Sequence, residues 1–405
     1  MNILIVSQYF WPENFRINDL AQELVARGHS VTVLTGVPNY PGGQVFKDFE
    51  DDSESFSSYK KVDIVRVPLI SRGSGSVRLL LNYLSFSLLA CILGPWKLRG
   101  RTFDVVFTCQ LSPVTVGLPG ALMAWIKKAP MAMWVLDLWP DTLKAVGVIK
   151  STRMLGYVAM LVRFIYRKCD LIFAQSKSFI PKIQALEGGR VPVIYFPSWA
   201  ENIFDSKMSK PAVEVPIKDG AFNIMFAGNI GEAQDFACIL SAAELLKNSL
   251  NIRWLIVGDG RMTSWVRAEI MSRSLENSVF LLGRYPVERM PDFFSHADAM
   301  LVTLADEEIF SMTIPGKLQS YLAAGIPIIA ALNGEGAEVV RLADAGFTCP
   351  SGNSSDLAKI VKKMSELSVS DRLAMGARGL KFSEREFNRI QVIDLAEKHL
   401  SSLCK

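Results

Sequence analysis

Short apolar runs alternate with stretches of helical spacing along most of the chain. Residues 3–6 form the first run, and a helical pattern at 17–27 leads to a second run at 31–34. Strand, helix and strand in this order predict a βαβ unit. Further apolar runs predict strands at residues 62–67, 105–108, 132–136, 171–174 and 192–195. Because helical patterns separate most of these runs, we expect a parallel, doubly wound sheet, with residues 36–61 as a long loop.

A second alternation of the same kind follows a change in composition. Residues 196–220 are rich in proline, lysine and serine and lack periodicity, which predicts a linker. Strands are then predicted at 223–226, 253–257, 279–282, 299–303, 326–330 and 347–348, with helices near 235–247, 261–273, 286–295, 315–324, 335–344, 353–366 and 383–402. We therefore expect an N-terminal domain at 1–196, a linker at 197–220, a C-terminal domain at 221–382, and a terminal helix within 383–405 that crosses back to the first domain.

The stretch 310–330, FSMTIPGKLQSYLAAGIPIIA, predicts a helix that begins at an anion site and leads into a buried strand. Pro315 suits the first turn of a helix, and Gly325 suits its end. The first amides of a helix have no intrahelical acceptor, and the helix dipole places about half a positive charge there. The amides of Gly316 and Lys317, with the Lys317 ammonium, therefore predict a pocket for a diphosphate.

Composition narrows the classes of function. The chain has 405 residues, half of them apolar, which favours two cores over one. A net charge of +4 argues against a dedicated nucleic-acid binder and leaves room for a basic patch facing anionic lipid. Six cysteines without CxxC or metal-type spacing indicate reduced thiols in the cytoplasm. The loop after the first strand lacks GxGxxG spacing, which disfavours a nicotinamide cofactor.

Six segments in order resemble glycosyltransferase family 4: IVSQYFWPE near the N-terminus, residues 24–35, FAGNIG at 226–231, LIVGDG at 255–260, FLLGRYP at 280–286 and IPGKLQSYLAAGIPIIA at 314–330. The resemblance implies an α/β GT-B fold, with two facing doubly wound parallel-sheet (Rossmann-like) domains and a cleft between them. Within the family the chain is most similar to the L-N-acetylfucosamine transferases of O-antigen and capsule assembly, the WbuB type. This implies metal-independent, retaining transfer of a sugar from a UDP-sugar, held by the C-terminal domain, to a lipid-linked or saccharide acceptor, held by the N-terminal domain.

Donor-binding positions follow from the same resemblance. They fall on Gly228, Asn229, Arg284, Tyr285, Thr313, Ile314, Pro315, Gly316, Lys317 and Ser320. Relatives carry an Arg at position 229 and a Lys within 232–234, where this chain reads Asn229 and Glu-Ala-Gln. Their pair of glutamates falls on Met312 and Ser320. We therefore expect positive charge for the leaving group from Lys317, Arg284 and the helix start, and a hydroxyl contact from Ser320.

Asp137 and Asp141, in WVLDLWPD, join Lys317 as catalytic candidates. Relatives often carry a His-Asp pair here, and Leu136 takes the place of the His. One carboxylate would meet the acceptor hydroxyl or the donor sugar; alternatively, the two are a helix cap and a solvated turn acid. The acceptor is expected at Glu13, Asn14 and Arg16, because open parallel sheets bind ligands beyond the carboxyl ends of their strands. The acidic run 306–308 reads as solvent-facing, and no metal site is expected.

Residues 79–96 carry no charge over 18 positions and are flanked by arginine and lysine. The segment lies between two strands of one sheet, where a crossover helix is required. A membrane span, a buried crossover and a crossover whose outer face enters lipid all stay open, and the basic, apolar stretch 153–168 favours the last. A polyprenyl-diphosphate-linked acceptor would need such a surface. We thus expect a cytoplasmic protein, peripheral on the inner face of the plasma membrane.

Two other functions fit the same scaffold. The missing Arg, Lys and glutamates are compatible with a non-catalytic partner that binds a nucleotide sugar or a glycan. A UDP-sugar epimerase or hydrolase is the other alternative.

Overall fold

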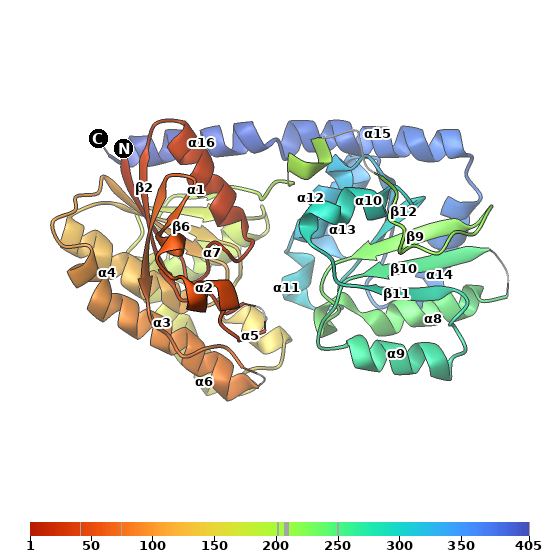
Figure 1. Ribbon diagram of the computed structural model, residues 1–405, viewed down its shortest axis with the longest axis horizontal. Helices are drawn as coiled ribbons and strands as arrows, with labels where there is room; N and C mark the ends of the chain where they lie inside the picture. Colours follow the sequence, from red (N-terminus) through yellow and green to blue (C-terminus); the bar gives the residue numbers. More distant parts are fainter. Residues whose placement is uncertain (41, 74, 201, 206–209, 249–250, 405) are drawn as a thin grey trace. The chain divides into compact units, whose positions relative to one another are not determined.

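The computed structural model describes residues 1–404 except 41, 74, 201, 206–209 and 249–250. The chain divides into two compact units, shown in Figure 1: unit 1 comprises residues 1–197 and 390–405, and unit 2 comprises residues 198–389. Each unit is built on its own sheet, as predicted for two doubly wound domains. The boundary after Pro197 falls at the start of the expected linker.

Unit 1 contains an eight-stranded sheet of order β3-β4-β2-β1-β5-β6-β7-β8. The strands are β1 (Asn2–Val6), β2 (Ser30–Gly36), β3 (Ser58–Tyr59), β4 (Val62–Val67), β5 (Val105–Gln110), β6 (Met131–Val135), β7 (Leu171–Ala174) and β8 (Val193–Tyr195). All pairs are parallel except β3–β4, which is antiparallel. The prediction of a plain loop at 36–61 was therefore wrong, because this stretch holds β3, a short helix α2 (Lys47–Asp51) and a 3-10 turn η1 (Ser55–Ser57).

Helices cover both faces of this sheet. They are α1 (Arg16–Ala26), α3 (Ser76–Lys97), η2 (Val114–Val116), α4 (Gly117–Lys127), α5 (Asp141–Ala145), α6 (Thr152–Tyr166), α7 (Phe179–Glu187) and α16 (Arg389–Leu403). Within unit 1, Figure 1 shows α3, α4 and α6 on one side of the sheet and α1 and α16 on the other. Each face is thus shielded from water, as a parallel sheet requires.

The C-terminus differs from the single helix predicted at 383–402. Helix α15 (Val369–Glu386) ends before Phe387, and α16 begins at Arg389. Arg27 donates to Asp394 at 2.5 Å and to Glu397 at 2.7 Å, so α16 is fastened to the turn after α1. The sequence pattern hid the break, because apolar residues keep helical spacing on both sides of it.

Unit 2 contains a six-stranded parallel sheet of order β11-β10-β9-β12-β13-β14. The strands are β9 (Phe222–Ala227), β10 (Ile252–Val257), β11 (Val279–Gly283), β12 (Ala299–Thr303), β13 (Ile328–Ala331) and β14 (Gly346–Cys349). The helices are η3 (Asn202–Asp205), η4 (Glu232–Gln234), α8 (Phe236–Leu246), α9 (Thr263–Ser272), η5 (Val287–Arg289), α10 (Met290–Phe294), α11 (Glu308–Ser311), α12 (Gly316–Ala323), α13 (Gly334–Leu342), α14 (Ser354–Ser365) and α15. The helix predicted at 286–295 is split between η5 and α10, and α15 was not predicted.

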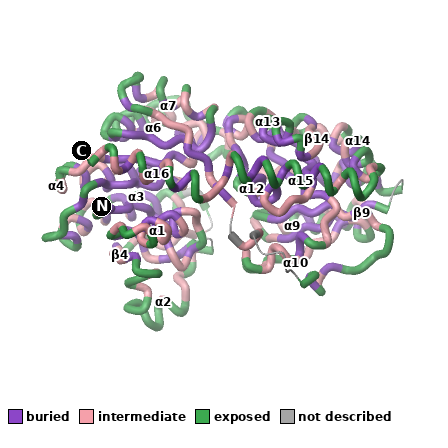
Figure 2. The backbone as a smooth tube through the Cα atoms, turned by 90° about the horizontal axis from the view of Figure 1, so that it is seen from above, coloured by how far each residue is buried: buried purple, intermediate pink, exposed green. Residues whose placement is uncertain are grey.

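The strands form the cores of both units. Every residue of β5, β6, β7, β10, β12 and β13 is buried. Figure 2 shows this buried backbone inside an exposed outer layer, with α2, which buries no residue, as an exposed projection. Because all strands of unit 2 run parallel, their carboxyl ends meet at one edge of the sheet, where polar groups of several loops gather.

Candidate functional site

The start of α12 lies beside the carboxyl end of β9. The ammonium of Lys317 lies 3.8 Å from the centroid of the Phe226 ring. A Cβ added at Gly228 would lie 3.2 Å from the Lys317 Nζ, so the ammonium is close to this glycine. Pro315 caps the helix with extended backbone, and the helix begins at the exposed Gly316. The predicted helix start and its lysine therefore meet the glycine of FAGNIG, although Pro315 lies one position outside the helix.

Gln234 is the hydrogen-bond partner of this ammonium. Lys317 Nζ donates to Gln234 Oε1 at 2.5 Å. The backbone of η4 is held in turn by β12, since the Thr303 hydroxyl donates to the Gln234 carbonyl at 2.5 Å. Burial lowers the pKa of Lys317 to about 7, and no carboxylate among the described residues forms an ion pair with it. A half-buried ammonium with a neutral partner favours the arrival of an anion.

Tyr321 fixes the spacing between α12 and β9. Its hydroxyl donates to the Ala227 carbonyl at 3.0 Å and accepts from the Ala227 amide at 2.9 Å. Ala227 is the last residue of β9, where it pairs with Val257 of β10, and it immediately precedes Gly228. The helix that carries Lys317 is thus tied to the peptide that carries Gly228.

Gly228 and Gly258 end neighbouring strands in close contact. A Cβ at position 258 would lie 1.8 Å from the Gly228 carbonyl oxygen, and the φ of both glycines is +147°. Only glycine satisfies both conditions at 258. The close approach leaves backbone, and not side chains, at the bottom of the site.

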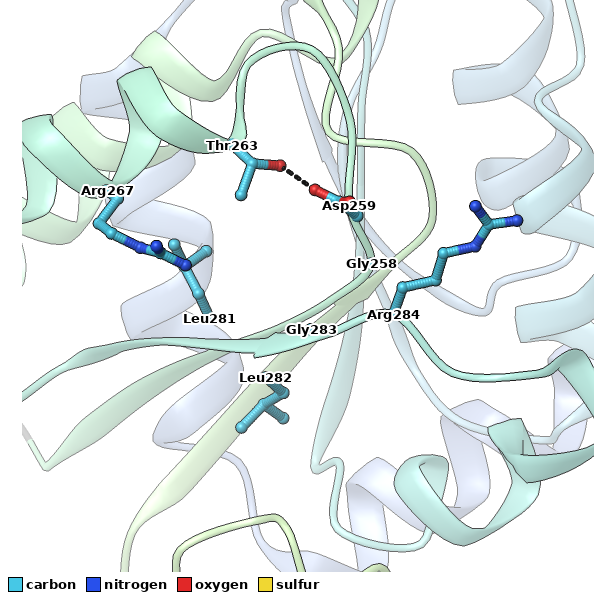
Figure 3. Close-up of a pocket in the computed structure, with 8 residues that line it drawn as sticks. All are labelled: Gly258, Asp259, Thr263, Arg267, Leu281, Leu282, Gly283 and Arg284. Atoms are coloured by element: carbon cyan, nitrogen blue, oxygen red, sulfur yellow. Dashed lines mark hydrogen bonds between the residues drawn. The ribbon is translucent and has the colours of Figure 1, made fainter. Parts of the chain in front are cut away.

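A hollow of about 290 Å³ opens beside Gly258 (Figure 3). Asp259 Oδ1 accepts from the Thr263 hydroxyl at 2.7 Å and from the Gly260 amide at 2.8 Å, and these bonds lower the pKa of Asp259. Figure 3 shows Arg267 and Arg284 on either side of this turn. The hollow is therefore lined by one fixed carboxylate and two arginines, residue types suited to the hydroxyls and phosphates of a nucleotide.

Most of the other predicted donor-binding residues are buried or engaged with neighbouring residues. Ser320 is buried at 8% exposure, and Ile314 is buried too. The Thr313 hydroxyl donates to the Ile309 carbonyl at 2.9 Å. The ring of Tyr285 packs on Phe293 with centroids 4.5 Å apart, whereas Asn229 is exposed. These residues shape the loops around Lys317, and Asn229 faces solvent beside Gly228.

Asp137 lies just beyond β6 in unit 1, within a network of donors. The Thr142 hydroxyl donates to its Oδ1 at 2.5 Å and the Trp139 indole to its Oδ2 at 3.1 Å. Burial raises the pKa of Asp137, and the hydrogen bonds oppose this effect. Asp141 is half-buried as the first residue of α5, whose cap is Pro140. Asp137 is therefore a held carboxyl group, and neither aspartate caps α5.

Glu13 is 3% exposed and organises the loops after β1 and β2. Its Oε1 accepts from the amides of Asn39 and Tyr40 at 2.8 and 2.7 Å, and its Oε2 accepts from the Phe10 amide at 3.2 Å. Burial raises its pKa to about 7. Of the predicted acceptor residues, Asn14 is exposed and Arg16 half-buried at the start of α1, while the Glu13 carboxylate is occupied by backbone amides.

Acidic residues 306–308 lie at and before the start of α11, where Asp306 accepts from the Asn333 amide group at 2.8 Å. Among the described residues, no group of three or more His, Cys, Asp or Glu side chains has a metal-binding arrangement.

The sequence did not point to three groups of the site: Gln234, Tyr321 and Phe226. Gln234 lies within residues 232–234, where the resemblance places a lysine that this chain lacks, and its own side chain was therefore not considered. Tyr321 fitted the apolar spacing of the helix, yet a buried tyrosine hydroxyl usually finds a partner, and that expectation was the available signal.

Two family models match this chain. Residues 14–199 match one described as "Glycosyl transferase 4-like domain", and residues 221–366 match one described as "Glycosyl transferases group 1". Together they span most of both units.

Individual proteins show the same likeness. The glycosyltransferase WbjE of Pseudomonas aeruginosa is 25% identical, over 67% of this chain and 68% of its own. The colanic acid biosynthesis glycosyl transferase WcaI of Escherichia coli (strain K12) is 26% identical, over 80% and 82%. Anabaena HepE, solved in complex with UDP and glucose, superposes with a TM-score of 0.69 at 15% identity, over 99% of this chain and 100% of that one. This last likeness concerns the fold alone and confirms the predicted GT-B fold class.

Proposed function

We propose that this chain, a glycosyltransferase with a 4-like domain followed by a group 1 domain, transfers a sugar from a UDP-sugar to a lipid-linked or saccharide acceptor in polysaccharide assembly. N-acetyl-L-fucosamine is the first donor sugar to test, because the sequence resembles transferases of that sugar. Relatives named for polysaccharide biosynthesis and a structural neighbour that binds UDP support this proposal.

The observation that carries the proposal is the position of the Lys317 ammonium at the end of β9, 3.8 Å from the Phe226 ring centroid and beside Gly228, where an added Cβ would lie 3.2 Å from Nζ. A departing UDP develops negative charge on its β-phosphate, and oriented amides and an ammonium stabilise that charge. Lys317 belongs to the first turn of α12, and its ammonium donates to Gln234 and forms no ion pair with a carboxylate among the described residues. The β-phosphate oxygen would also accept the acceptor proton, as in retaining transfer, and a metal ion is not required to neutralise it.

Asp137 is the candidate group for the acceptor side in unit 1. Side-chain donors hold its carboxyl in one orientation, and burial raises its pKa, which makes the carboxyl a stronger proton acceptor than an exposed aspartate. Glu13 would act indirectly, by holding the backbone of Asn39 and Tyr40 against the loop that carries Asn14.

A membrane contact through α3, α4 and α6 would give access to a polyprenyl-diphosphate-linked acceptor. The inner side of α3 includes the fully buried Asn82, whose side chain bonds to Gln8 and to the Ile70 carbonyl. Its outer side exposes apolar residues at helical spacing: Leu80, Leu84, Leu88, Ile92 and Trp96. The inner side also buries Tyr83, Phe86 and Ala90, so α3 is apolar on both sides, whereas a helix that faces water carries polar residues on its outer side.

Charge supports the same contact. Helices α3, α4 and α6 contain five basic residues and no acidic one: Arg78, Lys97, Lys127, Arg153 and Arg163. Within the described part of the chain, only α3 (Val77–Lys97, mean hydropathy 1.7) has the length and composition of a membrane span. Since it connects two strands of one sheet and packs on α4, we propose that it lies along the surface of an anionic membrane on the cytoplasmic side.

Ligand binding followed by turnover tests the function. UDP and a panel of UDP-sugars should raise the melting temperature of the protein, and a labelled sugar should then pass from the stabilising donor to an extracted lipid acceptor. Binding without any turnover would favour a non-catalytic partner that binds a nucleotide sugar or a glycan. Release of free sugar or of an epimer would favour a UDP-sugar hydrolase or epimerase. Absence of UDP binding would contradict the proposal.

A further inference from the structure

A groove of about 480 Å³ lies between α4 and α6 in unit 1. Its walls come from Leu118, Ala121, Leu122 and Trp125 of α4 and from Phe164 of α6. The two helices approach closely next to it, since a Cβ at Gly117 would lie 2.3 Å from Ile165 Cγ2. The groove is therefore a fixed gap between two packed helices.

Its apolar surface is unusually open. Trp125 is 77% exposed and Phe164 is 51% exposed, and both line the groove. Exposure of apolar area to water is unfavourable, so an apolar occupant would be favoured here. Helices α4 and α6, which form the groove, lie on the same side of the sheet as α3, within the surface that we propose contacts the membrane.

One end of the groove carries two opposite charges. Lys168 and Asp170 line it beside Ala129, at the amino edge of the sheet where β6 and β7 begin. Both side chains are exposed; the Lys168 ammonium lies 5.5 Å from the Phe164 ring centroid, and Asp170 Oδ2 accepts from the Met131 amide at 2.8 Å. The second oxygen of Asp170 and the ammonium of Lys168 together match a head group that carries a phosphate and an ammonium.

We propose that this groove binds one phospholipid, with a single hydrocarbon chain along α4 and a phosphoethanolamine head group at Lys168 and Asp170. The lipid phosphate meets Lys168, and the lipid ammonium meets Asp170. Because Lys168 and Asp170 lie at the amino edge of the sheet and Asp137 follows the carboxyl end of β6, this lipid is a membrane anchor distinct from the acceptor. The proposal rests on the membrane contact in the proposed function.

Binding of monomeric lipid tests the site without a bilayer. The probes are lysophosphatidylethanolamine, lysophosphatidylglycerol and lysophosphatidylcholine of equal chain length, each below its micelle-forming concentration, titrated calorimetrically into the full chain. Ala121→Trp fills the groove and should weaken the ethanolamine lipid about tenfold or more. Leu122→Ser, which makes the same wall polar without adding bulk, should weaken it in the same direction. Leu88→Trp, on the outer side of α3, should leave binding unchanged.

The head-group assignment has its own variants. Lys168→Gln should weaken all three lipids, whereas Asp170→Asn keeps the acceptor for Met131 and should remove only the preference for ethanolamine. The proposal would be overturned if the ethanolamine lipid bound the wild type and Ala121→Trp equally well, or if Leu88→Trp lost as much affinity as Ala121→Trp. A preference of the wild type for the glycerol or choline lipid would also overturn it. UDP binding is measured on the wild type and on each variant. If only the groove assignment fails, all of these proteins still bind UDP; if the proposed function fails, the wild type does not bind UDP.

Discussion

The Tyr321 hydroxyl bonds both to the amide and to the carbonyl of Ala227, at 2.9 and 3.0 Å. One side chain thereby satisfies both backbone polar groups of Ala227, the buried residue where β9 ends. Tyr321 and Ala227 lie 94 positions apart in the sequence. Their contact sets the distance between Lys317 and Gly228, so the geometry of the proposed diphosphate site depends on a contact outside it.

Replacement of Tyr321 by Phe should cost about 1–3 kcal/mol of unfolding free energy, because the Ala227 amide and carbonyl lose their partner in a buried place. UDP affinity should fall as well. Urea unfolding and calorimetry measure the two effects. Tyr166→Phe is the matched control, since the buried Tyr166 hydroxyl has no hydrogen-bond partner among the described residues. A Tyr321→Phe protein as stable as this control would contradict the assignment.

Lys317→Ala should lower the rate of transfer by about 10²–10³, the usual effect of removing one donor to a developing anion. Steady-state kinetics with the stabilising UDP-sugar measure it, and the melting temperature tests whether the fold survives. Lys363→Ala provides a control, because the Lys363 ammonium also lies over a ring, 4.2 Å from the Phe347 centroid, on α14. Comparable rates in the two variants would remove Lys317 from the mechanism.

UDP binding should weaken as pH rises above neutrality. Burial lowers the pKa of Lys317 to about 7, so the free protein loses this proton above that pH. A bound diphosphate favours the ammonium, and binding then requires proton uptake, which lowers affinity by up to about tenfold per pH unit. Titration calorimetry from about pH 6 to about pH 8.5 follows the trend. In Lys317→Arg the side chain stays charged, and the decline should disappear; the same decline in that variant would point to another group.

Glu13 should make unit 1 less stable as pH rises. Its folded pKa is about 7, above the ordinary 4.5, so the folded form holds the proton more tightly. The stabilisation is complete below about pH 4.5 and is lost as pH rises through about 7. Glu13→Gln keeps an acceptor for the backbone amides and removes this titration, so its unfolding free energy relative to wild type should be higher at about pH 8 than at about pH 5. Exposed Glu276→Gln should show no such change between the two pH values, and a constant difference for Glu13→Gln would contradict the expectation.

The double variant Leu88→Glu, Ile92→Glu should reduce binding to vesicles of phosphatidylethanolamine and phosphatidylglycerol by about tenfold or more. Two carboxylates would replace apolar contacts on the outer side of α3 and repel anionic lipid. Co-sedimentation measures binding, and UDP binding should be unchanged. Leu342→Glu on α13, where the leucine is 64% exposed, is the control. Undiminished sedimentation of the double variant would place the membrane contact elsewhere.

Local signals predicted the secondary structure around the site well. The Pro315-Gly316 helix start, the Gly325 end and the apolar run before Gly228 depend on residues close in sequence, and the strands of both sheets other than β3 followed from short apolar runs. The bond between Lys317 and Gln234 joins residues 83 positions apart, and no periodicity reports such a contact. Considering residues 232–234 only as the place of a missing lysine hid the role of Gln234.

Predictions failed where segments lacked a strong pattern of their own. Strand β3 has two residues and pairs antiparallel with β4, so its existence depends on a neighbour. The break between α15 and α16 is similar, since the apolar residues of the two helices pack in different units. The burial of Glu13 also escaped notice, because a glutamate in a loop usually faces water and only the folded backbone supplies its three amides.

The outward leucines of α3 have a practical consequence for the purified protein. In buffer without lipid, such a surface is covered by detergent or by another copy of the same molecule. Multimers that dissociate in mild detergent would then reflect non-specific hydrophobic association through α3, and should not be taken as the biological assembly state.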